Sequence, residues 1–153
     1  MIPVASLEEL EEFLGEKLDQ LEAGPPIAHS GIRLSQACKH VRRAILNDCP
    51  AAVRIACRVI VEDPGMPFGK LIKSGFARAL KQRVHLLSEM QRRGLAAKTC
   101  ALLGLEFCPR ETEDYCKLIK KFEPSELLPG IQAVRASDEK SRTLLQRLMS
   151  GSP

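Results

Sequence analysis

Aliphatic residues recur at the spacing of an α-helix along most of this sequence, and this spacing limits the fold more than any other feature. It is clearest near the start, where Ser6 and Glu9 form a capping box just before a stripe of leucines. The stripe comprises Leu7, Leu10, Leu14, Leu18 and Leu21, with Phe13 beside it. Aromatic residues make up only 4% of the chain and tryptophan is absent, so the core must consist mainly of Leu, Ile, Val and Ala. We therefore expect an all-α fold.

Proline and glycine divide this pattern into about seven or eight helices. The expected helices cover residues 6–23, 33–45, 51–62, 76–93, 95–105, 112–122 and 137–149, with short turns at 68–74 and after Pro124. Gly94 is expected to cap the C-terminus of the long helix 76–93, and Pro129 with Gly130 to break the second turn. The stretch 51–62 also fits a buried strand, because its β-branched residues alternate, but its helical neighbours favour a helix.

Length and composition predict a single compact helical domain over residues 1–153, since 153 residues with 44% hydrophobic content can bury one core. It would consist of an acidic first helix (6–23), a basic middle (33–98) and mixed-charge C-terminal helices (99–149). The tetrapeptide Lys70–Lys73 recurs as Lys117–Lys120, an offset typical of paired-helix repeats. We expect a helical bundle, with short HEAT- or armadillo-like packing as the alternative.

The sequence predicts an intracellular protein, cytoplasmic or nuclear. No apolar run reaches the roughly 18 to 20 residues that a membrane span needs, and the N-terminus becomes acidic at Glu8, unlike a signal peptide. The six cysteines include no C-x-x-C pair, so we expect buried thiols in a reducing compartment. A zinc site of Cys38, His40 and Cys49 is disfavoured because the first two would point to different faces of a helix.

No residue pattern here indicates catalysis, and we expect no enzyme, no cofactor and no metal. The three histidines lie in no motif that pairs a base with a nucleophile. The stretch Gly65–Leu71 resembles a phosphate-binding loop, but it has three residues between the glycines where the loop needs four. Leu71 also occupies the place of the Ser or Thr that would bind magnesium.

Charge is distributed unevenly along the chain. Residues 1–23 contain seven acids and one lysine, a net charge of −6, whereas residues 24–98 contain 14 cations and four acids, a net charge of +10. The remaining residues carry eight of each sign. One interpretation is that the acidic first helix packs beside the basic second or long helix and neutralises it.

The other interpretation is that part of the cationic surplus remains exposed and attracts an anionic partner. Its expected binding residues, mostly on the long helix 76–93, are Lys70, Lys73, Arg78, Lys81, Arg83, Arg92 and Arg93. This favours a non-enzymatic adaptor, scaffold or regulatory subunit that binds an acidic or amphipathic protein segment. The alternative is a domain that binds the RNA or DNA backbone, although few aromatics are available to stack on bases. The first helix could also mediate oligomer formation.

Overall fold

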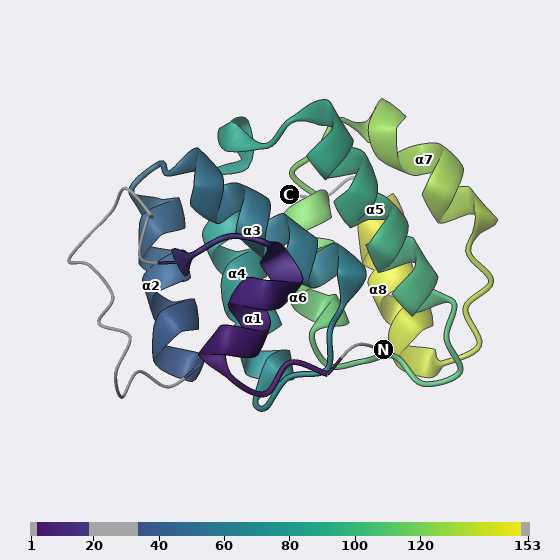
Figure 1. The fold of residues 1–153 in the computed structure, drawn as a ribbon. Coiled ribbons are helices and arrows are strands. Elements are labelled where there is room, and N and C mark those ends of the chain that lie inside the picture. The colour runs from purple at the N-terminus through teal and green to yellow at the C-terminus, as the bar shows by residue number, and fades with distance from the viewer. Residues whose placement is uncertain (1–2, 19–33, 151–153) are drawn as a thin grey trace.

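A computed structural model describes residues 3–18 and 34–150 of the chain (Figure 1). Over these residues the fold is all-α, as the spacing predicts, and contains eight α-helices. The α-helices are α1 (Leu7–Leu14), α2 (Leu34–Leu46), α3 (Pro50–Glu62), α4 (Gly69–Gln82), α5 (Glu89–Leu103), α6 (Thr112–Ile119), α7 (Pro124–Ala133) and α8 (Glu139–Met149). A short 3₁₀ turn, η2 (Val84–Leu86), joins α4 to α5. None of these described helices is long and apolar enough to cross a membrane.

The helix α3 occupies the centre of the packing. It contacts α2, α4 and α5, and its buried side chains include Val53, Ile55, Val59 and Ile60. Pro50 begins the helix, where a missing backbone N–H removes no hydrogen bond, and Asp63 ends it in a left-handed conformation (φ 53°). The residues that alternate like a strand are therefore helical: Val53, Ile55 and Val59 lie on the broad buried side of α3, and Arg54 and Arg58 lie on its exposed side.

Helices α4 and α6 lie side by side, and α5 packs across α3, α6, α7 and α8. Figure 1 shows α1 on the near side of α3, with α4 and α6 behind it and α5, α7 and α8 at the other end of the molecule. The core is aliphatic, with Phe76 and Tyr115 as its largest fully buried side chains. Because α6 contacts α4, α5 and α8, its position depends on all three.

The first helix begins as expected and ends earlier. Ser6 accepts a hydrogen bond from the backbone N–H of Glu9 (3.1 Å), and the Glu9 carboxylate accepts one from the N–H of Ala5 (3.1 Å). The helix ends at Leu14 because Gly15 adopts φ 71°, a left-handed conformation that a glycine adopts at little cost. Residues 19–23 of the expected helix lie outside the described residues.

The predicted long helix 76–93 is wrong. The structure has two α-helices here, separated by η2, and the predicted turn at 68–74 is the start of α4. Ser88 explains the break, because its hydroxyl accepts from Gln91 N–H while the Gln91 side chain accepts from Ser88 N–H, so a new helix begins there. Gly94, predicted as a cap, lies inside α5, which continues to Leu103 rather than restarting at residue 95.

Two further boundaries differ from the expectation. Pro129 does not break the segment after Pro124, which is the ten-residue helix α7 with Pro129 inside it. Pro124 occupies its first position, where proline is well tolerated. The recurring tetrapeptide occupies the start of α4 in one copy, whereas the other copy spans the end of α6, so the two copies hold different positions in their helices.

Candidate functional site

The structure does not bring the seven predicted binding residues together as one uncompensated surface. Five of them pair with carboxylates: Lys73 with Asp63 (2.6 Å), Arg78 with Asp114 (3.2 Å), Arg83 with Asp48 (2.9 Å), Arg92 with Glu126 (3.0 Å) and Arg93 with Glu89 (2.6 Å). Lys70 is exposed on α4 and Lys81 is half-buried, and neither has a carboxylate partner among the described residues. The acids that neutralise the other five come from several parts of the chain.

Lys73 departs furthest from the expected surface. Its side chain is only 7% exposed, and its ammonium group donates to the Asp63 carboxylate and to the Pro64 carbonyl (2.7 Å). Asp63 also pairs with Lys98 on α5, at 3.2 Å. This group of charges connects the end of α3 with α4 and α5, so the position of Lys73 fits a structural role.

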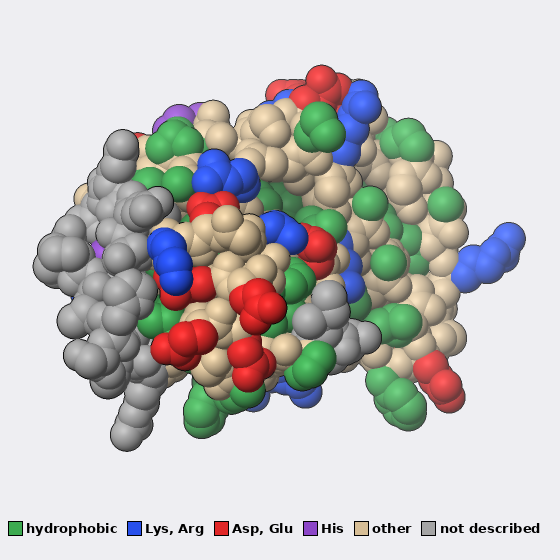
Figure 2. Space-filling view, in the orientation of Figure 1, with side chains coloured by type: hydrophobic (Ala, Val, Ile, Leu, Met, Phe, Trp, Pro, Cys, Tyr) green, Lys and Arg blue, Asp and Glu red, His purple; other side chains and the backbone are tan. Residues whose placement is uncertain are grey.

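The acidic first helix packs beside α2, as one interpretation of the charge pattern expected, and among the described residues part of its charge is neutralised by α3. Glu16 pairs with Arg54 (2.8 Å), and Arg58 donates to the Leu14 carbonyl (2.8 Å) while its guanidinium lies over the Phe13 ring. Other carboxylates remain at the surface, and Figure 2 shows acidic side chains gathered over α1. The exposed side of α1 is therefore acidic, with basic side chains around it on the same face.

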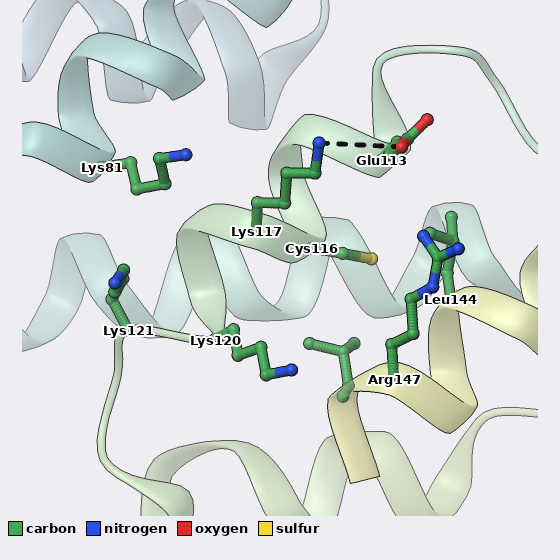
Figure 3. A pocket seen from close by; sticks show the side chains of 9 residues that line it. Lys81, Glu113, Cys116, Lys117, Lys120, Lys121, Leu144 and Arg147 are labelled. Carbon is green, nitrogen blue, oxygen red and sulfur yellow. Dashed lines mark ion pairs between the residues drawn. The ribbon is translucent and has the colours of Figure 1, made fainter. Parts of the chain in front are cut away.

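A cationic groove opens between α4, α6 and α8, with a volume of about 560 Å³ (Figure 3). Its lining residues are Lys81, Glu113, Cys116, Lys117, Lys120, Lys121, Leu144, Arg147 and Leu148. Cys116, Leu144 and Leu148 give it an apolar floor, and five cations surround that floor with Glu113 as the one carboxylate among these lining residues. This set of nine residues is called the cationic groove below.

Most of the cations in the cationic groove have no counter-charge within residues 3–18 and 34–150. Lys117 pairs with Glu113 one turn earlier in α6, at 3.7 Å. No carboxylate among the described residues lies within ion-pair distance of Lys81, Lys120, Lys121 or Arg147. Like charges held close together raise the electrostatic potential of the hollow between them.

The thiol in the groove floor is not an activated nucleophile. Burial raises the pKa of the Cys116 thiol to about 12, with weaker contributions from neighbouring cysteines and Glu113, so the group stays protonated at neutral pH. No histidine lines the groove. The lining therefore consists mainly of cationic side chains over apolar ones.

Of the groove residues, only Lys81 is among the binding residues predicted from the sequence. The sequence could also have indicated Lys117, Lys120 and Lys121, because they follow the i, i+3, i+4 spacing that places side chains on one face of a helix. Arg147 comes from α8, 26 residues further along the chain, so only the tertiary fold brings it to the same hollow.

A smaller hollow of about 290 Å³ lies between α2 and the start of α4. Its wall includes Phe68 and Leu71, whose side chains are 74% and 66% exposed, together with Lys39 and Arg42. Phe68 also has a positive φ of 55°. This hollow has fewer cations than the cationic groove and is about half its volume.

Within residues 3–18 and 34–150, no three or more His, Cys, Asp or Glu side chains are grouped so that they could hold a metal ion. Cys38 and Cys49, two members of the zinc site considered above, are buried free thiols. Comparison with protein-family models, with curated proteins and with solved structures found no match for this chain.

Proposed function

We propose that this chain is a non-enzymatic protein-interaction domain that binds an acidic, amphipathic segment of a partner protein in the cationic groove. The single observation that supports this most is the set of four cations without carboxylate partners around a floor of Cys116, Leu144 and Leu148. An acidic partner would neutralise charges that the described residues leave uncompensated. Its apolar side chains would cover the floor.

The form of the groove suits a helical ligand. Leu144 and Leu148 are four residues apart on α8 and therefore lie on the same side of that helix, one turn apart. Both are buried (4% and 9% exposed), so they close the bottom of the groove, and an amphipathic helix laid along it would rest its apolar side there, as in helix-in-groove recognition. The volume of about 560 Å³ falls in the range of ordinary ligand pockets.

Nucleic acid is the second candidate, because lysines and arginines also bind phosphates. Proteins that bind single strands usually stack the bases on aromatic side chains, and no aromatic residue lines the cationic groove. A nucleic acid would gain charge contacts there but little from the leucine floor. The apolar floor therefore favours a protein segment.

Fluorescence anisotropy tests this proposal with two labelled probes. The first is a peptide of about 16 residues, with leucines at i, i+4 spacing flanked by glutamates, and the second is a short single-stranded RNA. The groove variant carries Lys120→Glu, Lys121→Glu and Arg147→Glu. We expect wild-type protein to bind the peptide, and the groove variant to bind it about tenfold or more weakly, because three attractive contacts become repulsive.

The matched control carries Lys39→Glu, Arg43→Glu and Arg135→Glu, three exposed cations outside the cationic groove. It changes the net charge by the same amount and should retain most of the peptide affinity, while circular dichroism checks that both variants stay helical. Equal losses in the two variants would mean that net charge, and not the groove, attracts the peptide. Tighter binding of RNA, with a steep salt dependence and no peptide binding, would support the second candidate.

A further inference from the structure

The cationic groove continues into a second hollow along α8, of about 510 Å³. The two share Glu113, Leu144 and Arg147, so they form one continuous channel over α6 and α8. The added lining consists of Asp138, Glu139, Lys140 and Thr143. This part has three carboxylates, Glu113, Asp138 and Glu139, against two cations, Lys140 and the shared Arg147, and is called the acidic end.

Helices α6 and α8 run in broadly the same direction along this channel. Glu113, in the first turn of α6, lies beside the first turns of α8. Lys120 and Lys121, just after the end of α6, line the part of the channel that contains Leu148 near the end of α8. Figure 3 shows the same order, with Glu113 at one end of α6 and the two lysines at the other.

Each helix also carries acids in its first turn and bases near its end, as its dipole favours. On α8 these are Glu139 and Arg147, and on α6 they include Glu113 and Lys117. Because the two helices point the same way, their charges reinforce one another across the channel. The result is a gradient from carboxylates at the acidic end to uncompensated lysines at the opposite end.

We infer that the channel selects an amphipathic helix that is acidic in its N-terminal turn and basic in its C-terminal turn, and binds it antiparallel to α6 and α8. This inference rests on the proposed function and adds the orientation and charge order of the ligand. In this arrangement the ligand's acids meet Lys120 and Lys121, and its bases meet Glu139 and Glu113. The ligand's dipole then also opposes those of the two helices beneath it.

The same charge order also stabilises the ligand helix before it binds, since acids at its N-terminus and bases at its C-terminus complement its dipole. A helix with the reverse order could meet the same charges only by lying parallel to α6 and α8, with its own dipole unfavourably aligned. Charge complementarity and the dipoles therefore favour one orientation, and the line of the channel along α6 and α8 sets the axis.

Glu139 is the most suitable residue to mutate at the acidic end. Asp138 caps α8 and also accepts a hydrogen bond from the Cys108 N–H (2.7 Å), and Glu113 pairs with Lys117. Glu139 is exposed, and its side chain has no partner among the described residues. Replacing it with Gln removes one charge from the channel and leaves these contacts in place.

The test is a double-mutant cycle between Glu139→Gln and the C-terminal lysine of an acid-first, base-last peptide, measured by anisotropy. We expect the protein change to weaken binding of this peptide by about two- to fivefold, and to have little effect once that lysine is glutamine. Glu106→Gln, an exposed acid outside the channel, is the matched control and should change neither affinity. Additive effects in the cycle would overturn the inference.

A nitroxide label at the peptide's N-terminus tests the orientation independently of affinity. It should broaden the backbone NMR signals of Lys120 and Lys121 more than that of Glu139, and the reverse pattern would overturn the antiparallel arrangement. If the peptide binds the cationic groove without this coupling and this orientation, the proposed function stands and the further inference fails. If neither charge order binds at all, both fail.

Discussion

Replacing Asp63 with asparagine should destabilise the protein more than replacing Lys73 with methionine, although each change removes the same ion pair. The Lys73 side chain is 7% exposed, and its ammonium group lies 2.6 Å from the Asp63 carboxylate. Asp63 has a second partner in Lys98, whereas the other acceptor for Lys73 is the neutral Pro64 carbonyl. The two residues are therefore left in unequal environments when the partner is removed.

The magnitudes follow from which charge remains buried. Asp63→Asn leaves the Lys73 ammonium group without an anion, and removing one partner of a buried pair costs about 3 to 5 kcal/mol. Asparagine tolerates the left-handed backbone at this position (φ 53°), so the change tests charge more than conformation. Lys73→Met leaves Asp63 paired with Lys98, and we expect a smaller loss of about 1 to 2 kcal/mol.

Urea denaturation followed by circular dichroism measures the free energy of unfolding of the wild type, both single variants and the double variant. The double variant should recover part of the loss seen in Asp63→Asn, because the unpaired ammonium group is gone. If Lys73→Met costs as much as Asp63→Asn, the reasoning is refuted. Lys73 would then stabilise the fold in some other way than by pairing with Asp63.

The pKa of Asp63 predicts how the loss of stability caused by Asp63→Asn depends on pH. Burial alone would raise the pKa of the carboxyl, but hydrogen bonds and charges from Lys73 and Lys98 outweigh it and lower the pKa below its usual value. A lowered pKa in the folded state stabilises the protein above the unfolded-state pKa of about 3.9, and this stabilisation is lost as the pH falls through the folded-state value. The penalty of Asp63→Asn should therefore shrink below about pH 4.

Two further measurements test local features. Phe68→Gly should raise the free energy of unfolding by about 0.5 to 1 kcal/mol, because the exposed ring contributes little packing and glycine removes the cost of a left-handed backbone. A clear drop in thermal stability would show instead that the ring packs against the fold. Cys116 in the native protein should react with a thiol reagent at about pH 8 far more slowly than half-exposed Cys108, because burial keeps its pKa at about 12. Site-resolved mass spectrometry gives both rates, and equal rates would contradict the buried, protonated thiol.

The sequence predicted the helices whose signals are local. The capping box at Ser6 placed the start of α1, and the neighbouring helices correctly favoured a helix over a strand for α3. The break after α4 was missed because the inward-facing residues Phe76, Leu80, Val84 and Leu87 keep helical spacing across it. Spacing does not reveal such a break, whereas the capping box at Ser88 does.

The candidate site was harder to predict, because it depends on which charges find partners far along the chain. Arg78 pairs with Asp114 and Arg92 with Glu126, at separations of 36 and 34 residues. Neither pair follows from the local sequence. A sum of charges over residues 24–98 therefore overstates how much positive potential remains near the residues that carry it.

These long-range pairs also explain where uncompensated charge does remain. Residues 99–153 carry equal numbers of acids and bases, yet they supply four of the five cations in the cationic groove. Two of their acids, Asp114 and Glu126, neutralise arginines of α4 and α5, and so are not available to Lys120, Lys121 or Arg147. Acids of the C-terminal helices thus neutralise part of the positive charge of the basic middle. The cationic surplus therefore appears between α4, α6 and α8. For this reason we place the binding surface in a segment whose net charge is zero.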